Sequence, residues 1–171
     1  MTGLIKHFAA RLLGYLCVLI FSLLVIDVLW GVATRYILGH QAYWTEELAR
    51  FLLVWLAMIG AALAYIDNKH LGMDIVTRSL DPHARRMANF VTHLAVLGFA
   101  AGVMVYGGTA LFVDRWNSGQ TMSALEIKKA WFYLSLPVSG LLISLFSLDA
   151  AIATALGRMT DTGSSPDTEA E

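Results

Sequence analysis

The stretch MANFVTHLAVLGFAAGVMVYGGTALFV, residues 87–113, contains 27 residues and no lysine, arginine, aspartate or glutamate. A helix that crosses about 30 Å of hydrocarbon needs about 20 apolar residues, so this stretch is long enough to span a membrane. As a helix it would be about 40 Å long, which predicts that it tilts or extends beyond the bilayer. It lacks the polar face that a surface helix of a water-soluble protein presents. We therefore expect a membrane-spanning helix here.

Three further stretches are nearly free of charge and similar in length. The four predicted spans are 12–34, 48–66, 87–113 and 130–156. Hydrophobic residues make up 57% of the chain and charged residues 15%, whereas an ordinary soluble domain has about 45–50% apolar and about 25% charged residues. Four such helices in a water-soluble protein of 171 residues would leave almost nothing to cover them. The sequence therefore predicts an all-α integral membrane protein with a four-helix membrane domain, residues 12–157.

Lysines and arginines near the ends of the spans predict the orientation of the chain, because cytoplasmic loops carry the excess. Seven of the 12 would lie on the side of the N-terminus: Lys6, Arg11, Lys69, Arg78, Arg85, Arg86 and Arg158. The others would lie on the opposite side: Arg35, Arg50, Arg115, Lys128 and Lys129. Both termini are therefore predicted to be cytoplasmic, as an N-terminal segment, 1–11, and a disordered tail, 158–171.

The connection between the second and third spans is weakly amphipathic over residues 71–80, LGMDIVTRSL. Apolar and charged side chains would fall on different sides of a helix at this point. A short helix lying in the cytoplasmic interface and an ordinary solvated loop are the two alternatives.

Several classes of chemistry lack the residues that they need. A single cysteine, Cys17, excludes a disulfide scaffold and a cysteine-rich metal site. A membrane haem needs two axial ligands, but only His93 of the five histidines falls inside a span. The chain has no HExxH, no CxxC and no glycine-rich phosphate loop, and its net charge of −1 favours no nucleic-acid partner. We expect no enzyme activity, cofactor or bound metal.

Asp27 lies inside the first span, where a charge is costly unless it is paired or hydrated. One interpretation is a relay for protons or cations, which would make the protein a small proton-coupled exporter acting as a homo-oligomer. The other is a structural carboxylate, either hydrogen-bonded between helices or close enough to the interface to reach water.

Trp44, Glu47, Arg50 and Trp55 form a dense cluster near the start of the second span. Both Glu46 and Glu47 have the spacing to bridge to Arg50 on one helical face. An arginine just inside the membrane edge needs a carboxylate partner. The cluster therefore indicates either a local clamp that fixes the start of the span or a contact with another protein.

Small residues recur at helical spacing in two spans. Gly98 and Gly102 form a GxxxG motif in the third span, and Gly60 and Ala64 have the same spacing in the second. Such residues let helix backbones approach closely. They predict either packing within this chain or a docking face for a partner subunit.

Several motifs, in their order and spacing, carry a resemblance to a known family. They are Arg35-Tyr36, Trp44-Thr-Glu-Glu-Leu-Ala-Arg50, Val54-Trp55, Gly60-Ala61, His70, Asp74, Gln120-Thr121, Leu125-Glu-Ile127, Trp131, Tyr133 and Leu136-Pro137. Together they resemble the small, DctQ-like membrane subunit of tripartite ATP-independent periplasmic (TRAP) transporters, over roughly residues 10–155. The segment Glu126-Ile-Lys-Lys129 departs from the family pattern, and Asp27 has no place in it.

This resemblance implies a scaffold subunit in the bacterial inner membrane, in contact with lipids and with a large multi-span subunit that carries the substrate and ion sites. A soluble periplasmic protein would deliver organic acids, and an ion gradient would drive their uptake. Glu47 and Arg50 would form a structural clamp near the periplasmic side, where the two tryptophans of the cluster anchor the helix. His70 and Asp74 would order the cytoplasmic loop.

Overall fold

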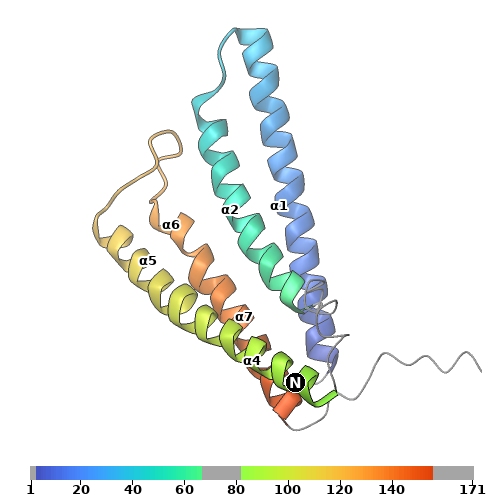
Figure 1. Cartoon of the computed structure of the whole chain (residues 1–171). Helices are drawn as coiled ribbons and strands as arrows, with labels where there is room; N and C mark the ends of the chain where they lie inside the picture. The colour runs from blue at the N-terminus through green and yellow to red at the C-terminus, as the bar shows by residue number, and fades with distance from the viewer. Residues whose placement is uncertain (1–2, 67–81, 156–171) are drawn as a thin grey trace, which may run out of the picture.

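The structure is a computed structural model that describes residues 3–66 and 82–155 (Figure 1). Within these ranges it is all-helical, and four helical segments are long and apolar enough to cross a membrane: Lys6–Leu38, Tyr43–Ile66, Phe90–Asn117 and Ala130–Ile152. The prediction of an all-α protein with four transmembrane helices is therefore confirmed. The connection 71–80 and the tail 158–171 lie outside the described residues.

The first two spans are single helices and the other two are composite. The elements are α1 (Gly3–Leu38), α2 (Tyr43–Ile66), α4 (Pro82–Phe99), the π-helix η1 (Ala100–Gly107), α5 (Gly108–Asn117), α6 (Ala130–Tyr133) and α7 (Ser135–Ala155). Helix α1 has 36 residues and is about 54 Å long. It ends at Gly39, whose positive φ of 75° suits glycine and stops the helix. Pro82 begins α4, where its missing N–H costs no hydrogen bond.

Helix α7 lies at the centre of the packing. It contacts α2 on one side and α4 with η1 on the other, while α1 packs against α2 (Figure 1). Half of the most apolar window of the Ala130–Ile152 span is buried, compared with 17% for each of the other spans. Large apolar side chains are exposed along the other helices, as expected of surfaces that face lipid.

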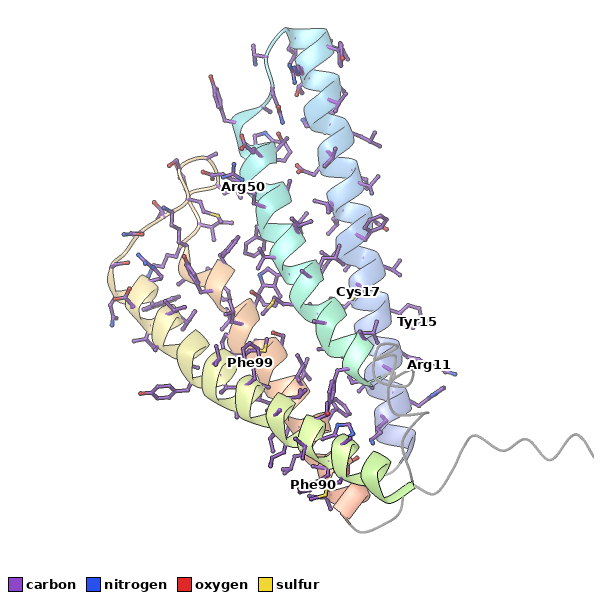
Figure 2. The ribbon with its side chains drawn as sticks, viewed as in Figure 1. Arg11, Tyr15, Cys17, Arg50, Phe90 and Phe99 are labelled. Carbon is purple, nitrogen blue, oxygen red and sulfur yellow. The ribbon has the colours of Figure 1, made fainter. Side chains whose placement is uncertain are left out.

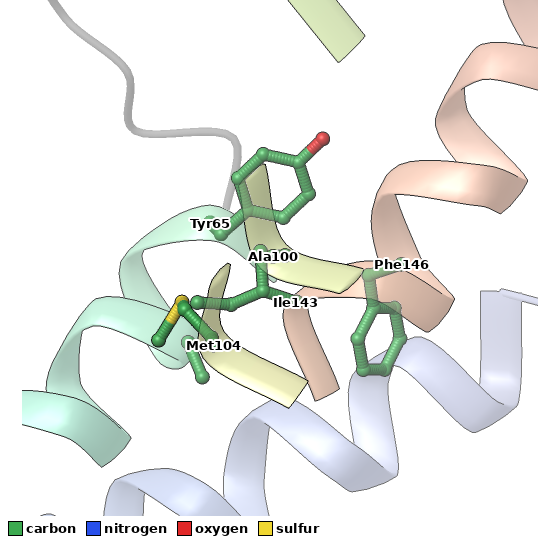
Figure 3. Packing of buried hydrophobic residues seen from close by; sticks show 6 residues of the cluster. Tyr65, Ala100, Met104, Ile143 and Phe146 are labelled. Carbon is green, nitrogen blue, oxygen red and sulfur yellow. The ribbon is translucent and has the colours of Figure 1, made fainter. Parts of the chain in front are cut away.

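Two apolar clusters hold the helices together. The first joins α2, η1 and α7 through Ala62, Tyr65, Ala100, Met104, Ile143 and Phe146 (Figure 3). The second joins α1 and α2 through Leu13, Ile20, Leu52 and Ile59. Because α2 contributes to both clusters, it connects α1 to the rest of the fold.

Two glycines let α7 approach the third span closely. A Cβ atom added at Gly140 would lie 2.5 Å from the Cβ of Met104 and 3.2 Å from the carbonyl oxygen of Ala100. One added at Gly108 would lie 2.9 Å from both Leu136 Cβ and Pro137 Cδ. The π-helix η1, with its i→i+5 pattern, lies directly at this contact. The contact therefore tolerates only glycine at these two positions without a shift of the neighbouring helix.

Polar contacts tie the helices together near the Gly3 end of α1 and the Ala155 end of α7. Lys6 Nζ of α1 lies 2.7 Å from Asp149 Oδ2 of α7. The Ser147 hydroxyl donates to the carbonyl oxygen of His93 at 2.7 Å, and the Tyr65 hydroxyl lies 2.9 Å from His93 Nδ1. His93, the histidine that the sequence placed inside a span, thus joins α4 to α2 and α7.

The glycine contact predicts a difference between two alanine substitutions. Gly140→Ala should lower the free energy of unfolding by about 1–3 kcal/mol, because the new methyl group overpacks the contact with Met104. Gly98→Ala should cause no loss, because no atom lies within 4 Å of the added Cβ. Thermal unfolding of the purified chain in detergent measures both. Equal losses in the two variants would contradict the close contact.

Candidate functional site

Glu47 holds a long connection of the chain in place. Its carboxylate accepts hydrogen bonds from the backbone N–H groups of Ser123, Ala124 and Leu125, at 3.1, 2.9 and 3.2 Å. These residues belong to the 118–129 loop, which joins α5 to α6. A hydrogen bond to an ionised group contributes up to about 3 kcal/mol to stability. Glu47 therefore fixes this loop to the start of α2.

Further contacts hold the 118–129 loop in a defined conformation. Thr121 and Lys128 form an isolated antiparallel bridge, and Met122 N–H donates to Ile127 O at 2.8 Å. Glu126 has a positive φ of 55°, which closes the turn between them. Lys128 Nζ lies 4.0 Å from the centre of the Trp116 ring. The sequence pattern predicted a role for Glu47 beside Arg50 and did not predict its contact with this loop.

Arg50 pairs with Glu46 and not with Glu47. Its Nη2 donates to Glu46 Oε1 one helical turn away, and both side chains are largely exposed, at 71% and 67%. An exposed pair of this kind contributes little to stability. Figure 2 shows Arg50 near the start of α2, on the side of the 118–129 loop. Of the two pairings that the sequence allowed, the structure forms the one with Glu46.

An open hollow of about 780 Å³ lies between the start of α2 and the 118–129 loop. Its lining residues are His40, Gln41, Ala42, Tyr43, Trp44, Glu46, Glu47, Arg50, Ser123 and Ala124. The hollow combines exposed aromatic side chains, one exposed ion pair and a loop fixed by Glu47. Such a surface can bind a protein partner, and it contains no nucleophile held by a base.

The two tryptophans of the predicted cluster lie in different surroundings. Trp44 is 39% exposed and lines the hollow. Trp55 is only partly exposed and packs near Phe51, with ring centres 6.2 Å apart, in the cluster between α1 and α2. Its indole N–H is buried and has no hydrogen-bond partner within the described ranges.

The glycines of the predicted docking faces have open space where a side chain would begin. Cβ atoms added at Gly60, Gly98 and Gly102 would each meet nothing within 4 Å. The close contacts within the chain are made instead by Gly108 and Gly140, which the sequence analysis did not select. Gly140 lies four residues before Ser144, which is a spacing of the same kind, but spacing alone does not say which small face meets a helix.

Three predicted site residues remain to be placed: Asp27, His70 and Asp74. Asp27 is buried in α1, at 5% exposure. His70 and Asp74 lie outside the described residues. Among residues 3–66 and 82–155, no group of three or more histidine, cysteine, aspartate or glutamate side chains could hold a metal ion.

Comparisons with known proteins agree with this picture. A family model described as "Tripartite ATP-independent periplasmic transporters, DctQ component" matches residues 24–157. A putative TRAP transporter small permease protein of Haemophilus influenzae is 28% identical over 150 residues, 88% of this chain and 91% of the relative. The sialic acid TRAP transporter small permease protein SiaQ of Vibrio cholerae is 30% identical over 111 residues, 65% of this chain and 62% of SiaQ.

Another relative is much longer than this chain, and only part of it matches the chain. The sialic acid TRAP transporter permease protein SiaT of Haemophilus influenzae is 27% identical over 131 residues. These residues make up 76% of this chain but only 20% of SiaT.

The contacts of Glu47 predict a difference between two adjacent glutamates. Glu47→Ala should free the amides of residues 123–125 and raise their hydrogen-exchange rates at least tenfold, because the acceptor of three N–H groups is lost. Glu46→Ala should leave these rates close to those of the wild type, because Glu46 contacts Arg50. Hydrogen exchange followed by mass spectrometry measures both. Unchanged exchange in Glu47→Ala would show that the loop is held by other contacts.

Proposed function

The chain belongs to the DctQ family of small permease subunits of TRAP transporters, and we propose that it is the static scaffold of a large transport subunit. It is a multi-pass protein of the bacterial inner membrane, with four helices that can cross the bilayer. Subunits of this family belong to transporters and not to enzymes. The exporter alternative built on Asp27 gains no support from these relatives.

The match to SiaT is the observation that carries the scaffold proposal. A unit like this chain occurs there as 20% of a much longer permease protein. A segment that is covalently joined to the rest of a permease in one protein is expected to lie against that part when it is a separate chain. We therefore propose a large multi-span subunit as the main partner.

The outer face of α4 and η1 is our proposed contact with that partner. Gly98 and Gly102 lie on it, and nothing in the described part of the chain covers them. Their neighbours Phe99 and Val103 are 58% and 55% exposed, so this face presents both small and large residues to its surroundings. In lipid, two helices gain little by burying apolar surface against each other, so their association depends on close packing. Small residues allow that close packing. The outer face of α1 carries bulky apolar side chains instead, which suits lipid.

We propose the orientation that the basic residues favour, with both termini in the cytoplasm. The hollow beside Glu47 and the 118–129 loop then face the periplasm. An ordered loop costs less conformational entropy on binding than a mobile one, so it suits a docking surface. We propose that this surface meets the periplasmic substrate-binding protein, with Trp44 and Arg50 at its edge.

The transported solutes are proposed to be organic acids, taken up by means of an ion gradient. Two relatives carry sialic acid in their names, which supports this class for the whole transporter. The hollow beside Glu47 is open and lies at one end of the described part of the chain. The substrate site is therefore proposed to lie in the large subunit.

The proposed contact predicts a selective loss of assembly. Leucine at both glycines, Gly98→Leu with Gly102→Leu, should reduce recovery of the large subunit with the tagged chain at least tenfold, because the larger side chains prevent close approach of a partner helix. Gly14→Leu, at an equally open position on α1, is the control and should leave recovery unchanged. Co-purification in mild detergent measures both. Normal recovery with the double variant would place the contact on another face.

The proposed energy source predicts the response of uptake to inhibitors. Cells carrying the complete transporter should lose organic acid uptake when ionophores abolish the ion gradients. Depletion of ATP with the gradients maintained should leave the initial rate of uptake unchanged. Uptake of a radioactive organic acid measures both, and dependence on ATP alone would contradict the proposal.

A further inference from the structure

A basic and aromatic patch lies where the third span ends and the fourth begins, and the scaffold role does not use it. This α5–α6 patch consists of Arg115, Trp116, Lys128, Lys129 and Trp131. The end of α5 and the start of α6 lie beside each other (Figure 1). The Phe90–Asn117 and Ala130–Ile152 spans end and begin at this point, so the patch lies at the depth of the lipid headgroups.

Aromatic rings hold two of the cations in place. Lys128 Nζ lies 4.0 Å from the centre of the Trp116 ring, and Arg115 Cζ lies 5.8 Å from the centre of the Tyr133 ring. Arg115 Nη1 also donates to Gln120 Oε1 at 3.4 Å. A ring covers one side of an ammonium or guanidinium group and leaves other N–H donors available. The two cations are therefore positioned without being neutralised.

The carboxylates nearby leave the patch with a positive charge. Lys128 and Lys129 form no ion pair within residues 3–66 and 82–155. Asp114 Oδ2 lies 3.8 Å from Arg115 Nε, and the Asp114 side chain is 69% exposed, so this pair is weak. With Glu126, the segment 114–129 contains three cationic and two acidic residues. The whole chain has a net charge of −1, so attraction of an anion to this point is a local property.

Exposed apolar side chains border the cations on the side of the membrane core. Trp116 and Trp131 are 42% and 45% exposed, and Leu111 and Val113 of α5 are 41% and 52% exposed. A soluble anion would contact the cations and leave this apolar surface uncovered. An anionic amphiphile would use both, because its headgroup binds the basic residues and its acyl chain covers the apolar ones.

We propose that the α5–α6 patch binds the headgroup of one anionic phospholipid. Arg115 and Lys128 bind the phosphate through charge-assisted hydrogen bonds, and Lys129 adds to the positive charge. The acyl chains lie along the exposed side chains of α5. None of the patch residues lines the hollow beside Glu47, and the lipid site does not depend on the scaffold role.

The test uses the full chain purified alone in a mild nonionic detergent. Thermal unfolding is followed in micelles that contain phosphatidylglycerol or, at an equal mole fraction, phosphatidylcholine, which carries a phosphate but no net charge. The midpoint should rise by roughly 3–6 °C for each tenfold increase in phosphatidylglycerol above the half-saturating amount, and phosphatidylcholine should not produce this rise. Inorganic phosphate should produce no rise either, because it has no acyl chain.

Paired substitutions separate the charge of the patch from its structure. Arg115→Gln with Lys128→Gln should abolish the difference between the two lipids. Arg115→Lys with Lys128→Arg keeps both charges and should keep the difference. Arg11→Gln with Arg35→Gln removes the same charge from exposed positions on α1 and should also keep it.

Three results would overturn the lipid site. One is a wild-type midpoint that is the same in the two lipids; if the glutamine pair at Arg115 and Lys128 then also lost the large subunit on co-purification, the patch would be a protein contact. Another is an equal rise with inorganic phosphate, and the third is an unchanged lipid response in that glutamine pair. If that pair fails to fold, Lys129→Gln, at an exposed side chain, should weaken phosphatidylglycerol binding several-fold, and an unchanged affinity would contradict the proposal.

Discussion

The close approach of α7 to η1 is the contact on which the arrangement of the other helices depends. In lipid, apolar side chains gain little by leaving their surroundings, so helices associate where their surfaces fit closely. Gly108 and Gly140 provide that fit, and the cluster around Met104 and Ile143 fills the space beside it. Helix α2 packs on α7, and α1 packs on α2. Each helix is thus positioned by the one before it in this series, beginning at the glycine contact.

The spans could be predicted from the sequence because their cause is local: a charged residue is costly in hydrocarbon wherever the helix packs. The packing of the helices against one another could not be predicted in the same way. The GxxxG motif at Gly98 showed that a helix can approach there, but the face that meets α7 carries Gly108 instead. Glu46 and Glu47 both have the spacing to reach Arg50, which pairs with Glu46. Glu47 binds the backbone of the 118–129 loop instead, and this loop is too distant in sequence for the spacing to reveal it.

The described residues combine well-packed contacts with uncovered apolar surfaces, a combination that fits the proposed scaffold role. Their polar contacts lie at the two ends of the helices, where Glu47 fixes one loop and Lys6 joins α1 to α7. Between them, the outer surfaces are apolar, and Gly98 and Gly102 leave open space where a side chain would begin. Three polar side chains lie away from the helix ends. His93 joins two helices through its contact with Tyr65. The Asp27 carboxylate and the Trp55 indole N–H have no hydrogen-bond partner in the described part of the chain.

The ion pair between Lys6 and Asp149 joins residues that are made at very different times during translation. Lys6 is synthesised 143 residues before Asp149, so the first helix remains without this counter-charge until the fourth span has been made. At about 5–20 residues per second this delay is on the order of ten seconds. The pair can therefore form only after α7 has joined the other helices.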